Sequence, residues 1–239
     1  RPVEDIYSSA LRQLDREDWE GAAKLFDEVE RQHPYSSWAR RAMLMSAYCY
    51  YQANKYDQAI LAAERFISLH PGNKDVPYAY YLKAISLYEQ IVDVGRDQRT
   101  TELALVALND VWQRFPQSEY ARDARLKIDL TMDHLAGKEM AIGRYYLRRQ
   151  QTVAAINRFR TVIERYQTTS HTPEALHRLT EAYLSLGLTK EAQTAAAVLG
   201  YNYPGSSWYE ESYALLAGQN LAPAEDKSSW ISRAWGSVF

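Results

Sequence analysis

The stretch His33-Pro34-Tyr35-Ser36-Ser37-Trp38 occurs again in two variant forms and one degenerate form: Phe115-Pro116-Gln117-Ser118-Glu119-Tyr120, Tyr203-Pro204-Gly205-Ser206-Ser207-Trp208 and His70-Pro71-Gly72-Asn73-Lys74-Asp75. In chain order, the four prolines are separated by 37, 45 and 88 residues. Proline cannot continue the helix before it, and serine can cap the helix after it. Each copy therefore marks a joint between two helices, and this period predicts an array of stacked helix pairs.

Two local signals predict where later helices begin. The spacing of Ser207-Trp208-Tyr209-Glu210 is that of a capping box, with Ser207 as the capping residue. Thr172-Pro173-Glu174 places proline at the first helical position and an acid in the first turn.

A second pattern, of small and apolar residues, lies inside each unit. Its copies are Ala22-Phe26-Val29-Pro34, Ala59-Ala63-Phe66-Pro71, Ala104-Leu108-Val111-Pro116, Ala192-Ala196-Leu199-Pro204 and, without the proline, Ala155-Phe159-Val162. Twelve residues before three of these copies lie Ala10, Ala47 and Gly143. These are signature positions of tetratricopeptide repeats, where small residues let two antiparallel helices approach closely. We predict an all-α protein, a right-handed α-solenoid of about five such repeats with a C-terminal capping helix and tail.

The repeat boundaries follow from the joints. The third repeat carries an insertion, and the fourth begins with a long helix. The predicted repeats are 4–34, 41–71, 78–116 with the insertion 90–101, 119–167 and 173–204, followed by a capping helix at 207–217. The predicted parts of the chain are an N-terminal half, 1–116, a C-terminal half with the capping helix, 117–218, and a linker and apolar tail, 219–239.

Composition excludes several classes of function. The net charge is −2, so the chain lacks the excess of positive charge that is typical of nucleic-acid-binding proteins. No apolar run reaches the roughly 18 residues of a membrane span. Cys49 is the only cysteine, so we predict an inert core thiol and no disulfide or thiolate metal site within the chain.

No nucleotide-binding, esterase or metalloprotease motif occurs, so we expect neither an enzyme nor a cofactor. The start at Arg1-Pro2-Val3 suggests a processed or trimmed form.

The first helix of each repeat is expected to line the concave face of the array. Counting from the signature positions, this face carries leucine, isoleucine and tyrosine side chains suited to an extended peptide or a partner loop. The predicted groove residues are Tyr7, Leu11, Leu44, Tyr48, Tyr51, Tyr81, Ile85 and Tyr88. The alternative is that several of these tyrosines pack between adjacent helices.

Three further features of the sequence are weaker candidates for a functional site. His171, Glu174 and His177 are spaced by three residues, but His171 is expected to precede the helix, so we favour surface residues over a metal site. The charged segment Asp93 to Arg99 is either a salt-bridged docking loop or a solvated loop.

The tail is the third of these candidates. A polar linker, Leu221 to Ser229, leads to the residues Trp230, Ile231, Trp235, Val238 and Phe239, which have helical spacing. This segment can fold back on the array, bind a partner subunit or lie at a membrane interface. We favour the first two because only Lys227 and Arg233 supply positive charge.

Longer matches narrow the resemblance to one family. In the first repeat, the matching residues are Ile6-Tyr7, Trp19, Ala22-Ala23 and His33-Pro34-Tyr35-Ser36. In the second repeat they are Ala47-Tyr48-Cys49-Tyr50-Tyr51 and Ala62-Ala63-Glu64-Arg65-Phe66-Ile67, and in the third they are Gly95-Arg96-Asp97 of the insertion. In the fourth repeat they are Ser118-Glu119-Tyr120, Asp123-Ala124, Tyr145-Tyr146 and Ala155-Ile156-Asn157-Arg158-Phe159. In this order they resemble the BamD family, the tetratricopeptide lipoproteins of the outer-membrane β-barrel assembly machinery. The resemblance covers the chain up to about residue 217.

The resemblance implies a scaffold at the periplasmic face of the outer membrane, held by an N-terminal lipid anchor that this chain does not contain. It implies that the C-terminal half binds the periplasmic domains of the barrel subunit BamA, with other Bam lipoproteins such as BamE as further partners. It implies that the N-terminal half binds unfolded β-barrel precursors, including C-terminal signals that end in an aromatic residue.

The position that matches the family's partner-facing arginine is Arg158, which is expected to pair with a carboxylate of the partner. The alternative is a surface arginine without such a role. The alternative function is another periplasmic tetratricopeptide adaptor, for example one that coordinates cell-wall synthesis with envelope constriction.

Overall fold

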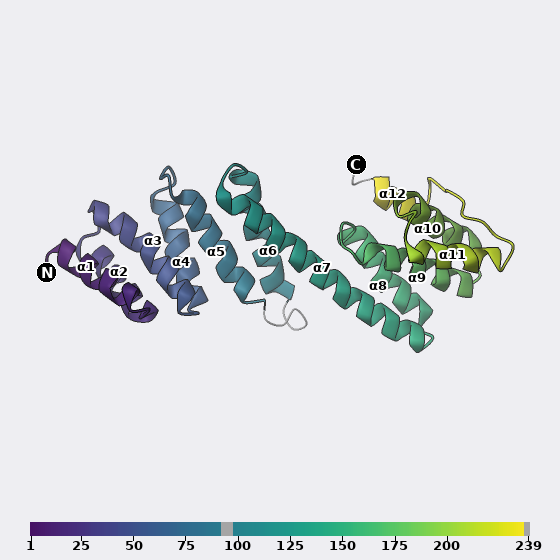
Figure 1. The fold of residues 1–239 in the computed structure, drawn as a ribbon, viewed down its shortest axis with the longest axis horizontal. Coiled ribbons are helices and arrows are strands. Elements are labelled where there is room, and N and C mark those ends of the chain that lie inside the picture. Colours follow the sequence, from purple (N-terminus) through teal and green to yellow (C-terminus); the bar gives the residue numbers. More distant parts are fainter. Residues whose placement is uncertain (92–97, 237–239) are drawn as a thin grey trace. The chain divides into compact units, whose positions relative to one another are not determined.

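The computed structural model describes residues 1–91 and 98–236, except for the side chain of Gln98, and within these residues the regular structure is entirely helical. The helices are α1 (Val3–Asp15), α2 (Trp19–Gln32), α3 (Ser37–Gln52), α4 (Tyr56–Leu69), α5 (Val76–Glu89), α6 (Gln98–Arg114), α7 (Glu119–Arg148), α8 (Thr152–Arg165), α9 (Thr172–Ser185), α10 (Thr189–Asn202), α11 (Ser207–Ala217) and α12 (Trp230–Gly236). The first ten form five helix pairs, and α11 follows as a capping helix (Figure 1). This confirms the predicted fold class.

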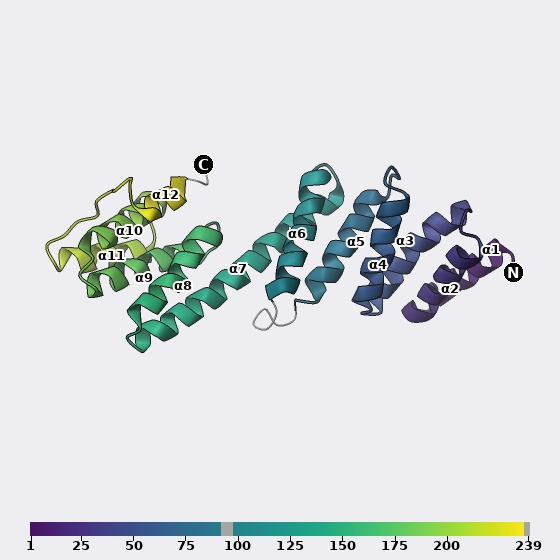
Figure 2. The ribbon, with the colours of Figure 1, turned by 180° about the vertical axis from the view of Figure 1, so that it is seen from behind.

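The chain divides into two compact units, residues 1–128 and 129–239, so the division falls inside α7. In unit 1, each helix from α1 to α5 packs on the next, and both α1 and α5 also contact α3 (Figures 1 and 2). In unit 2, α8 packs on α9, α9 on α10, and α11 on both α9 and α10. The predicted assignment of different roles to residues 1–116 and 117–218 remains a prediction.

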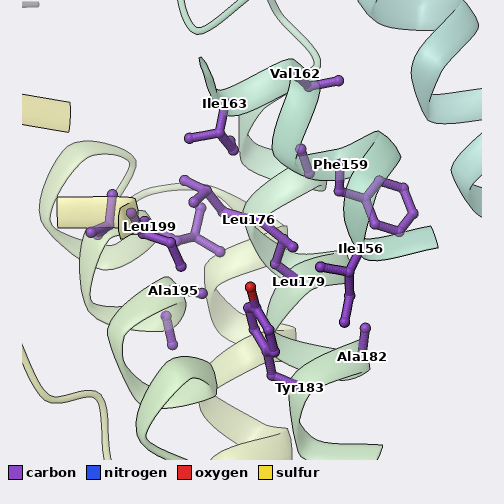
Figure 3. Packing of buried hydrophobic residues seen from close by; sticks show 14 of the residues in the cluster. Ile156, Phe159, Val162, Ile163, Leu176, Leu179, Ala182, Tyr183, Ala195 and Leu199 are labelled. Atoms are coloured by element: carbon purple, nitrogen blue, oxygen red, sulfur yellow. The ribbon is translucent and has the colours of Figure 1, made fainter. Parts of the chain in front are cut away.

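Small residues allow the close packing within a pair. A Cβ atom on Gly143 of α7 would lie 2.4 Å from Cε1 of Phe159 of α8, so no larger residue fits there without a shift. In the first pair, Ala10 and Ala22 are fully buried beside Phe26 in the equivalent packing. In unit 2, Phe159 belongs to a core that also contains Ile156, Leu176, Leu199 and their neighbours (Figure 3).

At the first proline-containing joint, the serine caps the next helix as predicted. The Ser36 hydroxyl donates to the His33 carbonyl over 2.8 Å, and its oxygen accepts from the Ala39 amide over 3.2 Å. At the third joint, Ser118 donates in the same way to the Phe115 carbonyl over 2.7 Å. The serine therefore ties the end of one helix to the start of the next.

Two details differ from the sequence pattern. The joint without proline keeps the same bond, because the Thr169 hydroxyl donates to the Tyr166 carbonyl over 2.8 Å. The residue that caps α11 is Ser206, not Ser207, and its side chain accepts from the Trp208 amide over 3.2 Å. The capping-box prediction was therefore wrong by one residue.

The turns inside four pairs, and the turn after α11, share one geometry. Two residues past the end of the first helix of each of these pairs, and three past the end of α11, the chain is left-handed, with φ from 58° to 74°. These residues are Glu17, Asn54, Gln150, Gly187 and Asn220. The following amide bonds back across the turn, as from Leu188 to the Tyr183 carbonyl over 2.9 Å. This is the Schellman motif, which satisfies the last carbonyls of a helix.

The tail folds back on unit 2, as favoured from the sequence. Ile231 of α12 is fully buried in the core cluster of this unit, and α12 contacts α8 and α10. Val238 and Phe239 lie outside the described residues, as do residues 93–97 of the predicted charged segment, so the role of that segment remains a prediction.

We expect Gly187→Ala to lower the free energy of unfolding by about 1 kcal/mol, because a Cβ atom disfavours the left-handed conformation. Open space surrounds Gly187, so the change tests backbone strain alone. The matched control is Gly205→Ala, which also meets no neighbour but lies outside the left-handed region. Equal urea midpoints for the two variants would contradict this account.

Candidate binding surfaces

The first surface is formed by the first helices of unit 1. Because α3 contacts both α1 and α5, the side chains on one face of these three helices gather into a continuous strip. Tyr48, Tyr51, Tyr78 and Tyr81 pack here over a small buried cluster that includes Leu82. We call this strip the tyrosine surface.

Aromatic contacts continue the surface onto the start of α7. The Tyr120 ring stacks on Tyr81 with centroids 5.0 Å apart and lies 5.4 Å from Tyr78. The Tyr81 hydroxyl donates to the Asp123 carboxylate, which also accepts from Lys127 Nζ over 2.9 Å. These two donors outweigh the effect of burial and hold the pKa of Asp123 below its usual range.

Hydroxyl groups of the tyrosine surface lie beside carboxylates. The Tyr51 hydroxyl is 3.5 Å from Glu89 Oε1, and its ring lies 5.9 Å from that of Tyr56. Burial, together with Glu89, raises the pKa of Tyr51 to about 12, so its hydroxyl stays a hydrogen-bond donor at neutral pH. Apolar rings with polar tips suit a peptide that offers both apolar side chains and backbone carbonyls.

The eight predicted groove residues do not all belong to this surface. Tyr7 and Ile85 are buried in the core; the Tyr7 ring packs on Phe26 and Trp38 with centroids 5.3 Å and 4.9 Å away. For Tyr7, the alternative of packing between helices holds, and Ile85 belongs to the buried cluster beneath the tyrosine surface. Leu11 is exposed, and the other five are half-buried, so their role in binding remains a prediction: Leu44, Tyr48, Tyr51, Tyr81 and Tyr88.

Sequence reasoning missed Tyr78, Tyr120 and Asp123. A signal exists for Tyr120, since it is the aromatic residue that ends one copy of the repeated stretch. The approach of Asp123 to Tyr81, 42 residues away, depends on packing between α5 and α7 and leaves no local pattern.

Arg158 lies on α8 and pairs within unit 2. Its Nη1 is 3.2 Å from Oε2 of Glu139 on α7. The arginine side chain is 40% exposed, whereas that of Glu139 is 11% exposed. The guanidinium therefore neutralises a nearly buried carboxylate and still reaches solvent; whether it also meets a partner remains a prediction.

Comparison with known proteins identifies the family. The model of the YfiO family, described as outer membrane lipoprotein, matches residues 1–199. The chain belongs to this outer membrane lipoprotein family. It is 62% identical over 224 residues to the outer membrane protein assembly factor BamD of Caulobacter vibrioides, a match that covers 94% of this chain and 73% of that protein.

A second relative and one solved structure complete the comparison. The assembly factor BamD of Rickettsia prowazekii is 48% identical, over 90% of this chain and 86% of its own length. Among solved structures, a Thermus thermophilus tetratricopeptide protein covers 90% of this chain and 98% of its own, with 18% identity and a TM-score of 0.41. Because that score is low, the repeat assignment rests on the helix pairs themselves.

The three residues considered as metal ligands have separate partners. His171 Nε2 lies 3.4 Å from Asp133 Oδ2, and Glu174 accepts from Arg144 over 2.9 Å. His177 is buried, with Nδ1 2.8 Å from the Ser212 hydroxyl. Among residues 1–91 and 98–236, no group of three or more His, Cys, Asp or Glu side chains is arranged to hold a metal ion.

Two further observations concern the sequence predictions on cysteine and membrane spans. Cys49 is fully buried, and burial raises the pKa of its thiol to about 12, in line with an inert core residue. Among the helices the structure describes, none combines the length and apolar character needed to cross a bilayer.

His177 of α9 is a buried histidine at the contact with α11. Its ring lies 5.3 Å from that of Trp208, and its Nε2 lies 3.6 Å from Glu211 and 3.9 Å from Glu181. Burial lowers the pKa of His177, and Arg178 adds to this, although Glu181 and Glu211 oppose it. Desolvation of the charged ring outweighs the two partly exposed carboxylates.

We expect the free energy of unfolding to fall as the pH drops below about 6.5, the usual imidazole pKa, because the unfolded chain then binds a proton that folded His177 resists. Above that pH the contribution is fully present. The measurement is urea unfolding from pH 8 to pH 5 for the natural chain and for His177→Gln. Since the variant keeps His70, whose pKa burial also lowers, the difference isolates His177. Parallel curves would contradict the assignment.

Proposed function

We propose that this protein is a non-enzymatic scaffold in outer-membrane protein assembly. The observation that carries the proposal is the 62% identity, over 94% of the chain, to an outer membrane protein assembly factor. A long array of helix pairs is well suited to this task because it offers extended surfaces for other polypeptides.

The proposed location is the periplasmic face of the outer membrane. The family description as outer membrane lipoprotein supports this, and a lipid attached upstream of Arg1 would supply the anchor. Such an anchor leaves the helix pairs free to meet partners in the periplasm.

The two units would then have different partners. In this proposal, the tyrosine surface of unit 1 binds segments of unfolded β-barrel precursors, since its rings and hydroxyls suit an extended peptide. Unit 2 binds the periplasmic domains of the barrel subunit BamA through the region of Arg158, and lipoproteins such as BamE are further partners.

We expect Arg158→Gln to weaken binding of the purified BamA periplasmic domains by at least about tenfold, because charge-assisted pairs at interfaces cost more than 1.4 kcal/mol to remove. The matched control is Arg165→Gln, which removes a charge from an exposed position of the same helix. Binding is measured by biolayer interferometry at a fixed salt concentration.

Loss of Arg158 also leaves Glu139 without its cation, so stability must be separated from binding. The double variant Glu139→Gln/Arg158→Gln removes both charges and should restore the melting temperature without restoring affinity. If either Arg158 variant bound the BamA periplasmic domains with wild-type affinity, the proposed role of this residue would be wrong. If the natural chain did not bind these domains, the proposal that unit 2 binds BamA would be wrong.

We expect Leu11→Asp to weaken binding of a peptide from the C-terminus of an outer-membrane β-barrel protein by about fivefold to tenfold, because a charge would be desolvated on the tyrosine surface. The same change at Leu103, an exposed leucine of α6, is the control. Fluorescence anisotropy of the labelled peptide reports the affinity. Equal losses for both variants would argue against the tyrosine surface as the site.

A further inference from the structure

The tail of unit 2 shows how this repeat array binds a short helix. Besides burying Ile231, α12 rests on α8 and α10, with α9 beneath. The Trp230 Nε1 donates to the Tyr183 hydroxyl over 3.0 Å, and the Arg160 guanidinium lies 4.4 Å from the centre of the Trp230 ring. A tyrosine from the first helix and a charged residue from the neighbouring second helix therefore hold one aromatic side chain.

The repeats contain the same positions in unit 1. The signature residues Ala22 and Ala155, like Ala59 and Ala192, are 133 residues apart. At this spacing, Tyr50 of α3 corresponds to Tyr183. By the same spacing, α2 corresponds to α8 and α4 to α10.

A hollow of about 670 Å³ occupies this equivalent place in unit 1. It has Asp27 of α2 on one side, Tyr50 of α3 at its floor, and Leu61, Arg65 and Leu69 of α4 on the other side. We call it the α2–α4 groove. Leu61 is 65% exposed and Leu69 is 58% exposed, so this groove presents two large apolar side chains to solvent.

The two grooves differ in charge at one equivalent position. Where α8 has Arg160, α2 has Asp27, whose carboxylate accepts from the Ser46 and Tyr50 hydroxyls over 2.5 Å each. These bonds fix the carboxylate at the wall of the groove. In unit 2, Arg160 contacts the Trp230 ring of the bound helix. In unit 1, the Asp27 carboxylate at the equivalent position favours a cation instead.

The other charges along the groove do not cancel Asp27. Arg65 pairs with Glu30 over 2.8 Å, and Lys83 pairs with Glu64 over 3.3 Å. Each cation is thus matched by a carboxylate of its own, and Asp27 remains as one further negative charge. Burial raises the pKa of Glu30, although Arg65 opposes this.

We propose that the α2–α4 groove docks a short amphipathic helix of a partner protein, which places a lysine or arginine against Asp27 and apolar side chains on Leu61 and Leu69. The groove lies on the second helices of the pairs, apart from the tyrosine surface. It therefore adds a second binding site to unit 1, independent of the proposed precursor site.

The probe is a labelled peptide of residues 226–236 in which Trp230 is replaced by lysine, because its parent helix already fits the equivalent groove. A second peptide carries glutamate at the same position. Fluorescence anisotropy with the full chain should show saturable binding of the lysine peptide, and binding of the glutamate peptide at least tenfold weaker. Leu61→Asp should abolish binding of the lysine peptide, whereas Leu103→Asp, the same change at an exposed leucine outside the groove, should leave it unchanged.

Several outcomes would overturn the proposal. They are no saturable binding of the lysine peptide, equal binding of the two peptides, and binding that survives Leu61→Asp in a chain with an unchanged melting temperature. Tighter binding of the unmodified peptide, lost on Leu61→Asp, would assign the groove to α12 of a second copy and would also overturn it. None of these results depends on the binding of BamA or of precursors.

Discussion

The rest of this structure depends on the close approach of the two helices in each pair. The approach requires small residues at the crossing, as at Gly143, where a Cβ atom would come within 2.4 Å of the Phe159 ring. Because Ala10 and Ala22 meet under the same constraint, Phe26 can fill the space beside them. Each pair thus presents two separate faces, one for each helix.

Hydrogen bonds at the turns and joints then set the direction of each helix. Schellman turns end the first helix of four pairs, and three of those turns use Glu17, Asn54 and Gln150 rather than glycine in the left-handed position. The bond common to the joints is a backbone one, in which an amide donates to the carbonyl three residues earlier. It is present at Asn73, where no hydroxyl is available, and at Thr169, where proline is missing. Regular joints place equivalent side chains in equivalent surroundings, as Tyr50 and Tyr183 illustrate.

The two faces of unit 1 offer different chemistry. On the first helices, tyrosine rings and hydroxyls form a surface organised by Asp123. On the second helices, Asp27 and two exposed leucines form a groove whose counterpart in unit 2 already holds a helix. One repeat pattern therefore yields both a surface of tyrosine rings and a groove with a carboxylate and two leucines, because residues outside the signature positions are free to differ.

The sequence alone determined the helix pairs, their number and the family resemblance, because helical spacing, prolines and small residues are local or periodic signals. It also predicts that Tyr48, Tyr51, Tyr81 and Tyr88 share a face, and the first three pack over one buried cluster. Only the tertiary structure decided that Tyr7 and Ile85 are core residues, that Arg158 pairs with Glu139, and that α12 returns to α8 and α10. These outcomes depend on contacts between residues distant in the chain, and burial of one side chain is set by the neighbours that other helices bring to it.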